Sequence, residues 1–198
     1  RAQMLLQELG LPTGDQHDLP SSTARFPDGA QYRIEIPSVE GPEALQAVLE
    51  TARTLGVTIH RVSQGSGIMM LSESEVHEMA RIGANNNIEV SLFVGPRAPW
   101  EGSAQSGVPD GKIFGWRHTG MDQMVYAFSD VEFAVTAGIR GVLVADEGLN
   151  WLVGRARKLG VLPSDLVVKG SALLGVTNPI AIRLLVDDGM DTINVASD

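Results

Sequence analysis

Residues 138–198 read GIRGVLVADEGLNWLVGRARKLGVLPSDLVVKGSALLGVTNPIAIRLLVDDGMDTINVASD. Three runs rich in β-branched residues are predicted to be strands: Gly141–Ala145, Leu166–Lys169 and Thr192–Ala196. Apolar residues at helical spacing fill the stretches between these runs, and each predicted helix closes on a glycine, Gly160 or Gly189. This alternation predicts parallel strands that are joined by crossover helices.

The preceding sequence repeats the same alternation. Further strands are predicted at Tyr32–Val39, Val57–Ser63 and Ile88–Val94. Helices are predicted at Arg1–Gly10, Pro42–Gly56, Ser72–Ala84, Leu149–Lys158 and Met121–Gly138, the last with a break near Ser129. A strand recurs roughly every 25–30 residues, apart from one long interruption, and no hairpin is predicted. We therefore expect a parallel (β/α) barrel of the TIM type.

Six strands are visible, whereas such a barrel needs eight, so the predicted barrel is incomplete. We expect residues 1–30 to form a helix and an irregular connection, and residues 31–198 to form the barrel domain. The barrel is expected to continue beyond residue 198, with residues 95–120 as a lid-like loop. An open, doubly wound parallel sheet is the alternative fold.

Composition narrows the classes of partner and cofactor. The net charge is −9, and no Lys/Arg cluster suggests a local basic groove, which argues against nucleic-acid binding. The absence of cysteine excludes a cysteine-held iron–sulfur cluster within these residues, but a divalent metal ion stays possible as a cofactor. No apolar run is long enough to span a membrane. We expect a cytoplasmic protein that acts on a small molecule or a peptide, and the sequence leaves homo-oligomer formation open.

The segment Gly138–Asp198 resembles the collagenase-like peptidases of family U-thirty-two. The resemblance is carried by the turn Val144-Ala145-Asp146-Glu147-Gly148 and by Lys169-Gly170-Ser171 through Val176-Thr177-Asn178. Lys169 stands where the family usually has His, and Leu174 and Gly175 replace polar positions. The family's Glu-containing strand and Cys-bearing turn would lie beyond Asp198. The resemblance implies a barrel and a peptidase-like hydrolase, whose site would comprise Glu40, Asp146 and Glu147.

Ligands of parallel barrels bind at the carboxyl ends of the strands, and Asp146 and Glu147 follow a strand there. This carboxylate pair is predicted to act as acid and base or to hold a divalent metal ion. Alternatively, Asp146 caps the following helix. Ser171 and Ser197 also follow strands and are candidate substrate-binding residues. Asn178, which belongs to the segment that carries the resemblance, is a further candidate that the resemblance implies.

Lys169 is the only lysine in a predicted strand. A lysine that points into a barrel loses solvation, which lowers its pKa and makes the amine available to attack a carbonyl group. Alternatively, Lys169 forms a structural ion pair with Asp146, Glu147 or Asp198.

His60 lies in a predicted strand, and Glu35 and Glu40 belong to the neighbouring strand and its end. A catalytic His/Glu site is therefore conceivable, and a hydrogen-bonded core histidine is the alternative.

The long interruption supplies the remaining candidates for substrate binding, which are Arg97, Trp100, Trp116, Arg117 and His118. Aromatic faces cover apolar or planar groups, and Arg binds carboxylate or phosphate. Alternatively, the tryptophans pack on the rim of the barrel.

Three functions remain open from the sequence. The first is the peptidase-like hydrolase. The second is a lyase or aldolase that uses either Lys169 as an imine-forming amine or a carboxylate-held divalent metal. The third is a non-catalytic barrel that binds a small molecule.

Overall fold

The computed structural model describes residues 1–95, 108–109 and 116–195. The chain divides into two units, residues 1–32 and 33–198. The first unit contains one short helix, α1 (Ala2–Glu8), none of whose side chains is buried. Its connection contains a turn in which the Gly29 N–H donates to the Phe26 carbonyl (2.8 Å).

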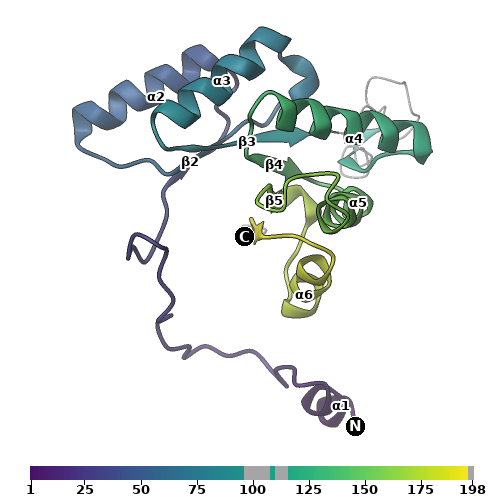
Figure 1. Cartoon of the computed structure of the whole chain (residues 1–198). Helices are drawn as coiled ribbons and strands as arrows, with labels where there is room; N and C mark the ends of the chain where they lie inside the picture. Colours follow the sequence, from purple (N-terminus) through teal and green to yellow (C-terminus); the bar gives the residue numbers. More distant parts are fainter. Residues whose placement is uncertain (96–107, 110–115, 196–198) are drawn as a thin grey trace. The chain divides into compact units, whose positions relative to one another are not determined.

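The second unit alternates strands and helices along the chain. Its strands are β1 (Glu35–Ile36), β2 (Arg61–Ser63), β3 (Glu89–Val94), β4 (Gly141–Val144), β5 (Val167–Gly170) and β6 (Thr192–Ile193). Its α-helices are α2 (Pro42–Leu55), α3 (Glu73–Asn85), α4 (Gly120–Thr136), α5 (Glu147–Lys158) and α6 (Pro179–Asp187), and short 3-10 helices span Ile68–Met70 and Ala172–Leu174. Figure 1 shows the helices α2 to α6 following one another around the strands.

The strands form one parallel sheet in the order β1-β2-β3-β4-β5-β6. A doubly wound sheet reverses its strand order at a switch point, and no reversal occurs here. The serial order confirms the predicted incomplete (β/α) barrel and excludes the open-sheet alternative.

The register shows how the sheet curves. Glu35 aligns with Arg61, which aligns with Glu89 on β3. From the other side of the sheet, Lys169 aligns with Leu143, which aligns with Phe93 on β3, four residues after Glu89. Strands tilt relative to the axis of a barrel. Residues at the same height along that axis are therefore offset from the paired residues by about one residue for each strand crossed. Four strand steps therefore bring Glu35 of β1 and Lys169 of β5 to the same height across the barrel interior.

Capping residues fix the starts of α3 and α5. Ser72 and Glu75 form the predicted capping box at α3. Asp146 caps α5, which begins at Glu147, two residues earlier than predicted, because the carboxylate accepts the Leu149 N–H in the first turn. The predicted break of α4 near Ser129 is wrong, because α4 is one continuous helix, and the Ser129 hydroxyl donates to the Val125 carbonyl one turn earlier (3.0 Å).

The apolar core lies between the strands and the helices. One cluster joins β3, β4 and β5 to α4, α5 and α6 through Val94, Val142, Val168 and Leu149. A second joins β2 and β3 to α2 and α3 through Leu45, Val62, Met79 and Leu92. Because side chains alternate along a strand, the intervening residues face the barrel interior.

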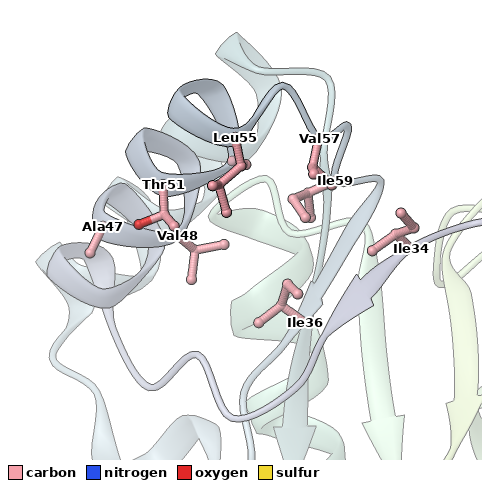
Figure 2. A pocket seen from close by; sticks show the side chains of 9 residues that line it. Ile34, Ile36, Ala47, Val48, Thr51, Leu55, Val57 and Ile59 are labelled. Atoms are coloured by element: carbon pink, nitrogen blue, oxygen red, sulfur yellow. The ribbon is translucent and has the colours of Figure 1, made fainter.

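An apolar hollow of about 400 Å³ lies between α2 and the outer side of β1. Figure 2 shows Val48 and Leu55 of α2 facing Ile36 of β1 and Ile59. Thr51 supplies the only hydroxyl among the lining side chains. This hollow belongs to the helix-facing layer and lacks ionisable groups, so it is not the candidate catalytic site.

No helix among the described residues has both the length and the apolar character needed to cross a lipid bilayer.

Candidate functional site

Lys169 is the largest side chain that is fully buried among the described residues, with 0% exposure. It lies on the inward face of β5, and its Nζ donates to Oε1 of Glu35 on β1. The two residues are 134 positions apart in the chain. Curvature of the sheet therefore places a primary amine beside a carboxylate inside the barrel.

Further charged and hydroxyl groups extend this contact along the first strands. Arg61 lies 3.7 Å from Glu35 and pairs bidentately with Glu89 (2.7 and 3.0 Å). The Ser63 hydroxyl donates to Glu35 (2.7 Å). We call Glu35, Arg61, Glu89 and Lys169 the inner charge cluster. Its formal charges balance, and each charged group has an opposite partner, as burial requires.

The Ser91 hydroxyl reaches Glu89 (3.2 Å) next to this cluster. Gly141 leaves room for that contact, because a Cβ at this position would overlap the Ser91 hydroxyl and lie 3.2 Å from Glu89 Oε1. The glycine on β4 thus lets two polar side chains of β3 share the barrel interior.

Burial and pairing shift the ionisation of the Lys169–Glu35 pair. Burial lowers the pKa of Lys169, and the hydrogen bond and charge of Glu35 offset only part of this effect. Burial alone would raise the pKa of Glu35, but the hydrogen bonds from Lys169 and Ser63 outweigh it, so the pKa of Glu35 is lowered. The cluster therefore favours the ionised carboxylate of Glu35, and the amine of Lys169 beside it loses its proton more readily than that of an exposed lysine.

An apolar layer accompanies the charged groups on the interior. It consists of Phe93, Leu143 and Ala145, with Trp116 packed against them. The rings of Trp116 and Phe93 lie edge to face, with centroids 6.1 Å apart. The structure thus places Trp116 against the barrel interior, which is compatible with both predicted roles of this residue, substrate cover and rim packing.

A second polar group gathers where β4 ends. Asp146 Oδ1 accepts the Leu149 N–H (2.7 Å), and Oδ2 accepts the backbone N–H of His118 (2.9 Å). The His118 ring nitrogen Nδ1 lies 3.5 Å from Oδ2, with the imidazole almost completely buried. Burial would raise the pKa of Asp146, but the bonds from His118 and Leu149 outweigh it and lower the pKa.

The Glu147 side chain accepts a bidentate contact from Arg117 (2.7 and 2.8 Å). Arg117 also approaches the carbonyl oxygens of Leu173 and Leu174 (3.4 and 3.5 Å). The described residues contain no group of three His, Cys, Asp or Glu side chains suited to a metal ion. The predicted metal pair Asp146 and Glu147 is thus split between a helix cap and an ion pair.

The hydrogen bonds described for Glu40 and His60 do not involve Lys169. Glu40 binds the loop after β2, through the N–H groups of Gly65 and Ser66. His60 accepts the Ile34 N–H on Nδ1 (3.1 Å), as expected for the alternative of a hydrogen-bonded histidine. The conceivable His/Glu site of His60 with Glu35 and Glu40 is therefore not assembled.

The other candidates serve as caps or cannot be placed. The Ser171 side chain caps the 3-10 helix by accepting from Leu173 (3.2 Å), and Asn178 caps α6 by accepting from Ala181 (2.9 Å). Arg97, Trp100 and Ser197 lie outside the described residues, as does most of the predicted lid.

Sequence reasoning assigned no site role to Arg61 or Glu89, and it did not pair Lys169 with Glu35. Two of the predicted partners of Lys169, Asp146 and Glu147, are wrong, because both are engaged at the end of β4. The third, Asp198, lies outside the described residues. One signal was present in the sequence. Glu35, Arg61 and Glu89 are charged residues within strands that are otherwise largely apolar, and the register aligns them on the same face of the sheet.

No family model matches the sequence. No curated protein matches it either.

Two of the solved structures that share the fold illustrate the likeness. Orotidine 5'-monophosphate decarboxylase from Sulfolobus solfataricus aligns with a TM-score of 0.51 and 11% identity, over 83% of this chain and 64% of that one. A candidate fructose-1,6-biphosphate aldolase from Coccidioides immitis aligns with a TM-score of 0.51 and 13% identity, over 82% of this chain and 55% of that one. The chain spans less than two thirds of either structure. At these identities the likeness shows the fold alone.

Proposed function

We propose that the protein is a carbon–carbon lyase of the aldolase type, in which Lys169 forms an imine with a carbonyl substrate. The observation that carries the proposal is the fully buried amine of Lys169, held against Glu35 inside the barrel. Imine formation needs a neutral amine, and the lowered pKa of Lys169 makes that form more accessible.

Glu35 supplies the partner for proton transfer. Lys169 passes a proton to Glu35, and the free amine then adds to the substrate carbonyl carbon, with loss of water to give the iminium. A base removes the proton of the β-hydroxyl group, the carbon–carbon bond breaks, and its electron pair moves into the iminium to form an enamine. Protonation of the enamine carbon and hydrolysis then regenerate Lys169. Among the described residues, Glu35 is the carboxylate in contact with Nζ of Lys169 and is therefore placed for these proton transfers.

The remaining charges of the inner cluster support this chemistry. Arg61 lies between Glu35 and Glu89, so it stabilises Glu35 as a carboxylate. Ser63 donates to the same Glu35 oxygen that Lys169 contacts, which fixes the orientation of the carboxylate. The two solved structures described above are named for a decarboxylase and an aldolase, but the proposal rests on Lys169 and its contacts.

The peptidase-like hydrolase has less support in the geometry. Its predicted residues Glu40, Asp146 and Glu147 bind a loop, a helix terminus and Arg117, respectively. None of these carboxylates contacts the inner charge cluster through an interaction that the structure describes. The resemblance to the collagenase-like peptidases stays a prediction.

Borohydride trapping tests the proposal. The protein is incubated separately with pyruvate and with dihydroxyacetone, reduced with sodium borohydride, and digested for peptide mass spectrometry. We expect the mass of the reduced imine on the peptide that contains Lys169, with little on Lys158, which is an exposed lysine of α5. Lys169→Met should abolish the adduct, and Glu35→Gln should slow its formation.

Circular dichroism must show that both variants are folded. A folded wild-type protein that gains no adduct from either probe, or that is labelled equally at Lys158, would contradict the imine mechanism.

A further inference from the structure

The loop that follows β2 directs three hydrogen-bond donors at one carboxylate. The N–H of Gly65 donates to Glu40 Oε1 (3.1 Å), and the N–H of Ser66 donates to Oε2 (3.0 Å). The Ser66 hydroxyl donates to Oε2 as well (2.5 Å). Successive backbone N–H groups that converge in this way form an anion-binding concavity.

Buried contacts hold this loop in position without Glu40. The fully buried Gln64 side chain donates to the Gly67 carbonyl and to the Ser66 hydroxyl (2.8 Å each). Its carbonyl oxygen accepts the N–H groups of Gly67 (3.2 Å) and Phe93 (3.3 Å). The donors of Gly65 and Ser66 are therefore fixed by an amide that bridges the loop and β3.

The backbone on either side of Glu40 is held in place, whereas its side chain borders on water. Glu40 is exposed, and it follows Val39, which is buried and donates to the Ser63 carbonyl (3.0 Å). Ser38 adopts a left-handed conformation (φ 57°), which is unfavourable for a residue other than glycine. The backbone next to Glu40 is thus anchored, while its side chain can rotate into water.

We propose that the N–H groups of Gly65 and Ser66, together with the Ser66 hydroxyl, form an anion-binding site. The Glu40 carboxylate fills this site in the free protein, and the phosphate or carboxylate group of a ligand replaces it. The loop follows the carboxyl end of β2, the end of a barrel at which ligands bind. The site would thus select ligands that carry an oxyanion.

The position of Gly65 fits this exchange. A Cβ there would lie 3.2 Å from Glu40 Oε1, tighter than an ordinary contact, so glycine allows close approach of an anionic oxygen to the backbone. Glu40 would compete with the ligand through its own negative charge. Removing the carboxylate should therefore strengthen anion binding rather than weaken it.

The experiment compares Glu40→Ala and wild-type protein, each titrated with sodium phosphate and, in a separate arm, with sodium acetate. Calorimetry measures affinity, and amide chemical shifts locate the binding site. We expect Glu40→Ala to bind at least one of these anions at least tenfold more tightly than wild type, with shifts at the Gly65 and Ser66 amides. The anion that binds more tightly indicates whether the site prefers a phosphate or a carboxylate group.

Two further variants distinguish an anion-binding site from a Glu40 side chain that only holds the loop in place. Glu43→Ala, which removes an exposed carboxylate three residues away, should bind no more tightly than wild type. Adding Ser66→Ala to Glu40→Ala should reverse the gain. A folded Glu40→Ala protein that binds neither anion, or binds without shifts at Gly65 and Ser66, would overturn the proposal. Because only binding is measured, the result does not depend on imine formation at Lys169.

Discussion

Glu35 and Asp146 have lowered pKa values for different reasons. Lys169 and Ser63 hold the first as a carboxylate inside the barrel, whereas His118 and the Leu149 N–H hold the second at the start of α5. A carboxyl group whose pKa is lower in the folded state stabilises that state at pH values above its unfolded pKa. Its contribution is lost as pH falls through the folded pKa.

This linkage predicts the response of the protein to acid. The ordinary pKa of Glu35 is 4.5, so the free energy of unfolding should decline as pH falls below about 4.5. Urea unfolding between pH 3 and 6 should show a shallower decline for Glu35→Gln than for wild type, because one proton-linked group is gone. Glu132→Gln, at an exposed position of α4, is the control and should keep the wild-type slope. Equal slopes for Glu35→Gln and wild type would contradict the assignment.

At this scale the sequence singled out Lys169 but not its partner Glu35. Lys169 was conspicuous as a lysine within an apolar strand, and burial follows from that placement. Its partner depends on the tilt and curvature of the sheet, because Glu35 lies four strands away in the sheet order. The sequence around Lys169 suggests the carboxylates of Asp146 and Glu147 as its partners, because they follow the neighbouring strand. In the structure Asp146 caps α5 and Glu147 pairs with Arg117.

Individual helices and strands were largely predictable because they depend on local signals. Apolar spacing, the capping box at Ser72 and the left-handed Gly56 fixed α2 and α3 closely. The strands β1, β2 and β6 are shorter than predicted, with β1 reduced to Glu35–Ile36. A β-branched run shows where the chain is extended, but the ladder forms only where a neighbouring strand aligns with it.

Packing between elements leads to a prediction for α5 and α6. A Cβ at Gly154 would overlap the Asp188 carbonyl oxygen and lie 3.2 Å from Gly189 Cα. Gly154→Ala should therefore reduce the free energy of unfolding by about 2–3 kcal/mol, although alanine favours the helix by about 1 kcal/mol. Urea unfolding measures the difference.

Gly148→Ala, in the same helix, is the matched control. Its new Cβ would meet only side-chain atoms, those of Asp146 and Met124, so we expect a change within about 1 kcal/mol. If Gly154→Ala proved as stable as Gly148→Ala, the close approach of the two helices would be incorrect.

For the whole molecule, the serial repeat of strands and helices predicted the barrel, and the structure confirms it. What the repeat could not predict is which inward side chains meet, because that depends on strand shear rather than on any local pattern. In a flat parallel sheet, β1 and β5 would lie about 19 Å apart, four spacings of about 4.8 Å. Side chains of Glu35 and Lys169 could not meet over that distance, so their contact reports the curvature of the entire sheet.

A double-mutant cycle tests this curvature in solution. Glu35→Gln, Lys169→Met and the double variant are unfolded in urea, and the coupling energy is taken from the four free energies of unfolding. We expect a coupling of about 1–3 kcal/mol, because the two groups share one buried interaction.

Lys169→Met alone should cost about 3 kcal/mol, since it leaves Glu35 without its buried cation. The exposed pair Arg140 and Asp165, 2.9 Å apart, gives the reference and should couple by less than about 1 kcal/mol. If Glu35 and Lys169 coupled no more strongly than this surface pair, the two strands would not face each other across a shared interior, and the proposed imine site would lose its proton acceptor.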